Sequence, residues 1–146
     1  MICVSPITIK IPNLAHNGPL VNATIALTTP LFEAMMKKAD PIPEPVKVMA
    51  LIDTGATSSV VAPDVIMRLG IFPTGSVKVN TPSCSGVLCN QYTAAIVLPN
   101  NIIIETTNLI EAPLQGQPIQ CLLGRDVKSQ AVLIYNGYTE EVTFSI

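Results

Sequence analysis

The sequence has few charged residues, no tryptophan and a single histidine. Charged residues make up 12% of its 146 residues, and the formal net charge is −2. Lys37 and Lys38 are the only adjacent pair of basic residues, so nothing predicts binding to nucleic acid or to an anionic membrane. His16 lies in the polar segment "NLAHNGP", where we expect a solvated side chain. With no second histidine, Ser-His or Cys-His catalysis has little support.

Long hydrophobic runs are also missing. No stretch approaches the roughly 18 uninterrupted apolar residues that a membrane-spanning helix needs. The opening "MICVSPITIK" lacks a basic start followed by a sustained apolar region, so a cleaved signal is not predicted. We therefore expect a protein with no membrane partner, located in the cytoplasm.

The cysteines are too few and too scattered to predict a metal site. They are Cys3, Cys84, Cys89 and Cys121. The pair at 84 and 89 has no second ligand pair at zinc-site spacing, so we predict neither a metal nor another cofactor. A hairpin disulfide between Cys84 and Cys89 stays open, because it depends on an oxidising compartment. Cys121 lies inside an apolar strand and is predicted to pack in the core.

Apolar residues, by contrast, are abundant. They make up 49% of the chain, which favours a folded domain with more buried or paired surface than a lone domain needs. That surplus suggests oligomerisation. The length suits one domain, 1–146, in which we separate an N-terminal strand and helix extension, 1–45, from a motif-bearing core, 46–146.

Strand patterns dominate, so the predicted fold class is all-β with short helices. "SPITIKI", "PLVNATIAL" and "VKVMALI" are short β-branched and apolar runs bounded by Pro or Gly. In "TPLFEAMMKKAD", Thr29 is the predicted N-cap of a two-turn helix that covers the core. A second short helix is predicted from Pro63 to Gly70.

The second half of the sequence predicts two hairpins and a helical turn. Strands at 76–81 and 87–98 flank a tip rich in Pro, Ser and Gly. "NNIIIETTNLIEA" and "IQCLLG" follow as apolar strands, and "GRDVKSQ" allows a turn or two of helix. The last hairpin is predicted to turn at Asn136-Gly137.

The segment "LIDTGAT" places an acid, Asp53, directly after an apolar strand. A small hydroxyl residue and Gly55 let the chain turn sharply there, so a surface turn is one explanation. A nucleotide-binding turn of the sugar-kinase or actin type is a second. It fits poorly, because Ala56 follows where threonine is expected and the second lobe has no room. Half of a site with two carboxylates is the third.

Two segments together resemble one family, the retropepsin-like aspartic proteases. The first is "DTGA", beginning at Asp53, and the second is "LLGRD", ending at Asp126. The resemblance covers about residues 46–146, including the order of catalytic turn, short helix, hairpin, apolar strand and glycine-arginine helix. The strand and helix expected before the strand that carries Asp53 are similar to those of bacterial members of the family. It implies a single-lobed acid-protease fold with a closed β-barrel, and an aspartic endopeptidase acting on peptide or protein substrates.

The chemistry of that family implies a second chain. One carboxyl must accept a proton from water while another donates one to the substrate carbonyl. A second Asp-Thr-Gly or Asp-Ser-Gly does not occur, since Asp40, Asp64 and Asp126 precede Pro, Val and Val. The partner carboxyl would therefore be Asp53 of another copy, which predicts a symmetric homodimer with the site on its two-fold axis.

The resemblance also assigns roles. Asp53 would be the catalytic acid or base, and Thr54, Gly55, Gly124, Arg125 and Asp126 would support it. Gly55, Ala56 and Thr57 would line the substrate cleft. Ser85, Gly86 and Val87 would belong to a flap, whose tip spans Pro82 to Val87. Many retroviral members carry aspartate where this chain has Thr57, so Asp126 or backbone carbonyls would have to satisfy Arg125.

A protein that keeps this fold without turnover, and acts as a dimeric peptide-binding module, is the alternative function. The presence of Asp-Thr-Gly is necessary for catalysis but not sufficient, so the sequence does not separate the two.

Overall fold

A computed structural model describes residues 6–80 and 85–146. Within these ranges the chain forms ten strands, four α-helices and one 3-10 turn, as the sequence pattern predicted for an all-β protein with short helices. The first half contains β1 (Ile7–Lys10), α1 (Leu14–Asn17), β2 (Leu20–Ala26), α2 (Thr29–Lys38), β3 (Val46–Ile52), β4 (Val60–Val61) and α3 (Pro63–Leu69). The second half contains β5 (Gly75–Val79), β6 (Val87–Leu98), η1 (Pro99–Asn101), β7 (Ile102–Glu111), β8 (Cys121–Leu123), α4 (Arg125–Lys128), β9 (Val132–Asn136) and β10 (Glu141–Ser145).

The larger sheet closes on itself as a barrel. Its strands follow the order β2-β3-β8-β4-β7-β6-β5, and β2 also pairs with β6, so six strands form a ring and β5 lies outside it on β6. Ile25 opposite Ile96 marks the closing contact. Because the ring is closed, it has no free edge, and the backbone N–H and C=O groups of each strand can pair on both sides. The prediction of a closed single-lobe barrel is confirmed.

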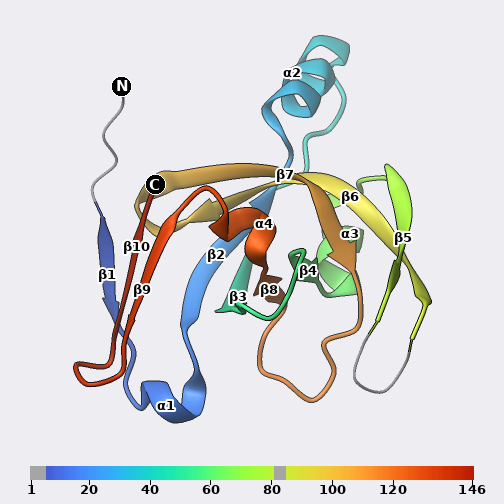
Figure 1. Cartoon of the computed structure of the whole chain (residues 1–146). Coiled ribbons are helices and arrows are strands. Elements are labelled where there is room, and N and C mark those ends of the chain that lie inside the picture. The colour runs from blue at the N-terminus through green and yellow to red at the C-terminus, as the bar shows by residue number, and fades with distance from the viewer. Residues whose placement is uncertain (1–5, 81–84) are drawn as a thin grey trace.

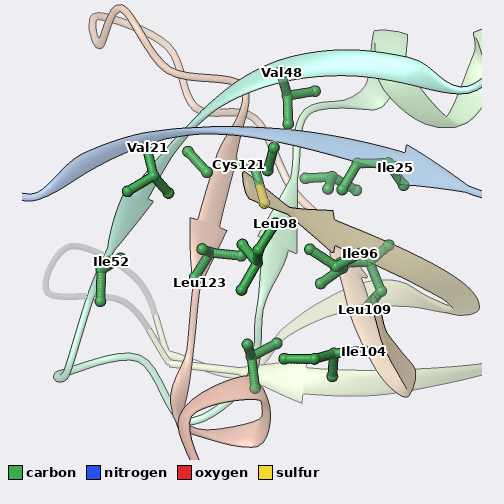
Figure 2. Packing of buried hydrophobic residues seen from close by; sticks show 14 of the residues in the cluster. Val21, Ile25, Val48, Ile52, Ile96, Leu98, Ile104, Leu109, Cys121 and Leu123 are labelled. Atoms are coloured by element: carbon green, nitrogen blue, oxygen red, sulfur yellow. The ribbon is translucent and has the colours of Figure 1, made fainter. Parts of the chain in front are cut away.

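The barrel interior is filled by the alternating apolar side chains of these strands. In β3, Val46, Val48, Ala50 and Ile52 are buried while Lys47 is exposed, which is the period of two expected for a strand with one face in the core. Figure 2 shows Cys121 and Leu123 of β8 within this cluster, near Leu98. Cys121 is fully buried, as predicted, and burial raises the pKa of its thiol to about 12.

A second, three-stranded sheet packs beside the barrel. Its order is β1-β10-β9, with antiparallel pairing throughout, so β1 and β9 are its two edge strands (Figure 1). Val142 and Phe144 of β10 are buried against the barrel core. The side chains of β9 are mostly exposed, among them Ile134 and Tyr135. Strand β9 is therefore an edge strand whose apolar side chains are mostly exposed.

Helix α2 differs from its prediction in length and position. Thr28, one residue earlier than predicted, is the N-cap, and the helix runs for ten residues, nearly three turns. It projects from one end of the barrel, opposite α1, and has no buried residue (Figure 1). The prediction that it covers the core is wrong, because the turn between β2 and β3 carries it beyond the barrel. Its apolar Leu31 and Met35 instead line a hollow with Leu69 and Ile71.

The last hairpin also turns differently. Asn136 pairs with Glu141 as the last rung between β9 and β10, so the connection has four residues, 137–140, in place of the predicted Asn-Gly turn. The Asn136 side chain accepts hydrogen bonds from the backbone N–H groups of Tyr138 and Thr139, both at 3.1 Å. These bonds form a local turn that competes with the tighter one.

Candidate active site

Asp53 lies where β3 leaves the barrel. Its backbone N–H donates to the carbonyl of Leu123 at 3.0 Å, which continues the parallel pairing of β3 with β8 by one residue. Its side chain is half-buried, and its Oδ1 accepts a hydrogen bond of 2.8 Å from the N–H of Gly55. The carboxyl is thereby oriented by its own loop while Thr54 and Gly55 remain exposed.

Gly55 leaves room for the carboxyl of Asp53. A Cβ added there would lie 3.1 Å from Oδ1 of Asp53, which is closer than ordinary contact. Any side chain at this position would therefore crowd the carboxyl and weaken the hydrogen bond that orients it.

Strand β8 and helix α4 hold the loop from its other side. The N–H groups of Arg125 and Asp126 donate to the carbonyls of Ala56 and Thr57 at 2.9 and 3.2 Å. The N–H of Gly124 donates to Oγ of Ser59 at 3.0 Å. The two segments with family motifs, 70 residues apart, are thus joined by direct backbone hydrogen bonds.

Gly124 packs directly against the loop backbone. An added Cβ would lie 2.4 Å from the carbonyl carbon of Ser58 and 2.8 Å from the nitrogen of Ser59. These distances are far below van der Waals contact, so only glycine fits without moving the backbone. Its backbone is extended, which means that space and not conformation selects the glycine.

The guanidinium of Arg125 binds the loop as a clamp. Its Nη1 donates to the carbonyls of Thr54 and Gly55 at 2.8 and 3.2 Å, and its Nη2 donates to Oγ1 of Thr57 at 3.0 Å. Of the two acceptors left open from the sequence, the backbone carbonyls are therefore used. Thr57 supplies a neutral acceptor where many retroviral members have a carboxylate.

Asp126 has different partners. Its Oδ1 accepts from Oγ of Ser59 at 2.8 Å, and its Oδ2 accepts from Oγ1 of Thr106 at 3.1 Å. Ser59 is fully buried and passes the interaction on to the N–H of Gly124. Asp126 thus fixes the end of the loop through two hydroxyls.

Sequence reasoning missed both hydroxyl residues. Thr106 occupies an inward, buried position in β7, where the alternation of Ile102 and Ile104 predicts an apolar residue. A polar residue at such a position needs a buried partner. That break in the pattern was the available signal.

Two hollows flank the exposed Thr54. One, of about 590 Å³, is lined by Asp53, by His16 on α1 and by Leu133 and Tyr135 on β9, among others. The other, of about 440 Å³, is lined by Thr54, Arg125, Lys128, Ser129 and Leu133. His16 is exposed, as expected, but its short helix α1 was not predicted, and the sequence did not place it beside Asp53.

The predicted flap corresponds to the β5–β6 hairpin. Gly86 has a positive φ of 69°, and its N–H donates to Oδ1 of Asn80 at 2.9 Å. Ser85, Gly86 and Val87 are exposed. Pro82, Ser83 and Cys84 lie outside the described residues, and so does the proposed pairing of Cys84 with Cys89. None of the described hairpin residues lines the hollow beside Asp53.

Among the residues described, no group of three or more His, Cys, Asp or Glu side chains could hold a metal ion. Over the same ranges, no helix is long and apolar enough to cross a membrane.

Comparison with known proteins identifies the family of this arrangement. The family model described as "Aspartyl protease" matches residues 43–127, which include both motif segments. A search of curated proteins finds no match.

Solved structures share the fold. A retropepsin-like aspartic protease from Rickettsia conorii superimposes with a TM-score of 0.58 at 13% identity, covering 96% of this chain and 90% of that one. An aspartic proteinase from Irpex lacteus gives 0.55 at 14% identity, covering 97% of this chain but 46% of that one. The predicted retropepsin-like fold, with a single lobe, is confirmed.

Proposed function

Because the chain belongs to the aspartyl protease family, we propose that it is an aspartic endopeptidase that cleaves peptide bonds with water activated between two Asp53 carboxyls, one from each identical subunit. The observation that carries this proposal is the loop itself. Asp53 is oriented by the N–H of Gly55 at 2.8 Å, and Arg125 clamps the carbonyls on either side of that N–H. The bond from the N–H of Gly55 also occurs in ordinary Asx turns, so the clamp by Arg125 is what sets this loop apart from a simple surface turn.

A second copy completes the chemistry. Hydrolysis needs one carboxyl to accept a proton from water and one to donate, and two adjacent carboxyls achieve this because they share a single proton. Only one Asp-Thr-Gly exists in the sequence. Two copies related by a two-fold axis through the loop would bring both carboxyls to the same place.

The surface around Thr54 supports such a dimer. Thr54 is exposed beside two hollows, and β9 contributes the apolar Leu133 and Tyr135 to their lining. Burying exposed apolar side chains of this kind stabilises association. In the dimer, the Thr54 hydroxyl would donate to backbone of the partner subunit's loop. The match to about half of the Irpex lacteus proteinase supports this arrangement, since two copies have a comparable length.

Substrate would bind along the exposed side of the loop and beneath the hairpin. Gly55, Ala56 and Thr57 would form one edge of the cleft, where a peptide can make backbone hydrogen bonds. Ser85, Gly86 and Val87 would close over the peptide and exclude water, and the positive φ of Gly86 suits a mobile tip. Gly124, Arg125 and Asp126 would act only by holding the loop.

The decisive experiment compares the wild-type protein with Asp53→Asn on a library of proteome-derived peptides. We expect cleavage by the wild type and its loss in the variant, which retains the shape of the side chain and its acceptor oxygen. Asp64→Asn, on the exposed start of α3, is the matched control and should cleave normally. Cleavage that continues in Asp53→Asn would refute the assignment.

Sedimentation equilibrium tests the second subunit. A protein that remains monomeric at high concentration could not assemble two Asp53 carboxyls. A dimer that retains peptides without cutting them would instead identify a peptide-binding module with this fold.

A further inference from the structure

Strand β9 is an uncharged edge strand with exposed apolar side chains. Its sequence is "VLIYN", and Val132, Ile134 and Tyr135 are 61%, 54% and 51% exposed. In the part of the chain that the structure describes, β9 pairs only with β10, so alternate N–H and C=O groups along its other side have no strand partner. Unpaired backbone groups of this kind, beside exposed apolar side chains, favour pairing with a strand of another chain.

The other two edge strands in the described ranges, β1 and β5, are protected against such pairing. Strand β1 follows Pro6, and its apolar Ile7 and Ile9 pack on the core, which leaves Thr8 and Lys10 exposed. Strand β5 carries one exposed lysine and no large exposed apolar side chain. Lysine and proline at an edge disfavour pairing with a second molecule. Of the three edges, β9 alone has neither.

Strand β9 also borders both hollows beside the Asp53 loop. Leu133 and Tyr135 line the hollow that contains Asp53, and Leu133 lines the second hollow together with Thr54. A chain that pairs with β9 is therefore placed next to this loop. Because a site with two Asp53 carboxyls is incomplete without a second copy, the partner that fits this edge is a second copy of the same chain.

We propose that β9 pairs with the β9 strand of a second copy, antiparallel and across the two-fold axis, so that the two three-stranded sheets join into one. The inference rests on the proposed function, which requires a second Asp53 beside the first. A two-fold axis through the middle of β9 gives antiparallel pairing of the strand with itself. Ile134, the middle residue, then lies opposite the partner's Ile134, and Leu133 lies opposite the partner's Tyr135.

This pairing explains why the side chains of β9 are apolar on both faces. Side chains alternate along a strand, so Val132 and Ile134 lie on one face and Leu133 and Tyr135 on the other. Each face would gain apolar neighbours from the second β9, and apolar or aromatic pairs directly across two strands stabilise a sheet. Because β9 has no charged residue, no like charges meet at the axis.

Sedimentation equilibrium of edge variants tests the pairing. Ile134→Lys places two like charges directly opposite each other, so we expect the dissociation constant of the dimer to rise about tenfold or more. Thr8→Lys adds the same charge to the other edge of the same sheet and should leave the constant unchanged. Both positions are exposed, so we expect both variants to fold. Equal dissociation constants for Ile134→Lys and Thr8→Lys would overturn the proposal.

Chemical cross-linking tests the same contact without disrupting it. Neighbouring strands lie about 4.8 Å apart, so a short bismaleimide should link Ile134→Cys to its symmetry mate, whereas the two copies of Thr8→Cys are five strand spacings, about 24 Å, apart. The wild type, with its four native cysteines, is the blank. We expect a covalent dimer from Ile134→Cys alone, which should still cleave peptides at dilutions where the unlinked protein has dissociated. Failure of Ile134→Cys to link would contradict the pairing.

The Asp53→Asn background separates this inference from the protease assignment. The variant should dimerise and cross-link through position 134 as the wild type does, because β9 pairing does not involve the carboxyl. A protein that dimerises through β9 but cleaves no peptide would refute the protease assignment alone. A protein that cleaves peptides as a dimer insensitive to Ile134→Lys would refute the pairing alone. If Ile134→Lys raises KM and leaves sedimentation unchanged, β9 binds substrate in place of a second copy, and the proposal is wrong.

Discussion

Replacing Gly124 by alanine tests whether the contact between the two motif segments holds the site together. The added methyl would meet Ser58 at 2.4 Å from its carbonyl carbon and 2.6 Å from its carbonyl oxygen. Favourable contacts between carbon atoms lie at about 3.5 to 4 Å, so α4 and the loop must separate by about 1 Å. The obstruction is backbone, which cannot rotate away as a side chain can.

That separation would break the hydrogen bonds that join the segments. The bonds concerned are Gly124 N–H to Ser59 Oγ at 3.0 Å, Arg125 N–H to Ala56 O at 2.9 Å and Asp126 N–H to Thr57 O at 3.2 Å. At about 0.5 to 1.5 kcal/mol each, losing two or three of them lowers the free energy of unfolding by about 1 to 4.5 kcal/mol. We also expect cleavage to be lost, because the Asp53 loop is no longer held.

Urea unfolding at a fixed protomer concentration measures this change, since association would otherwise alter the apparent stability. Gly75→Ala is the matched control. Its added Cβ would meet only the flexible end of Gln91, at 3.3 Å, so we expect a change below about 1 kcal/mol. If Gly124→Ala is as stable as Gly75→Ala, the close packing described for this glycine is wrong.

Two further predictions concern buried groups near the same loop. Ser59→Ala should lower the free energy of unfolding by about 2 kcal/mol, because it leaves the N–H of Gly124 and one oxygen of Asp126 without their partner. Thermal denaturation would show this, and a Tm equal to that of the wild type would contradict it. Burial raises the pKa of Cys121 to about 12, so the folded state keeps a proton that the unfolded thiol loses above about pH 9. The free energy of unfolding should therefore fall between those two pH values by up to about 1.4 kcal/mol per pH unit. Cys121→Val should reduce this slope, as measured by urea unfolding at several pH values. An identical slope in the variant would show that Cys121 is not the group responsible.

The strands and the two motif segments could be predicted because their signals are local. In β3 the alternation of Val46, Val48 and Ala50 fixes the buried face, and Asp53 follows directly after it. The helix of Pro63 to Leu69 is bounded by its proline and by Gly70 in the left-handed conformation. Local signals of this kind survive in any tertiary context that keeps the strand half-buried.

What failed depended on tertiary context. The apolar residues of α2 predicted burial, but the helix lies past the end of the barrel, a position set by where β2 and β3 end. The Asn136-Gly137 pair predicted a tight turn, yet the Asn136 side chain bonds to the two following backbone amides. In both cases the sequence signal was real and a competing interaction determined the outcome.

The clamp of Arg125 shows how the departure at Thr57 is accommodated. Arg125 is exposed, and without a carboxylate at position 57 its N–H groups bond to other acceptors in the loop. Here the carbonyls of Thr54 and Gly55 take one nitrogen and the hydroxyl of Thr57 takes the other, all within 3.2 Å. Because a hydroxyl carries no charge, the clamp adds no negative charge next to Asp53. The guanidinium is thus held by neutral acceptors alone, while the carboxylate of Asp126 accepts from the hydroxyls of Ser59 and Thr106.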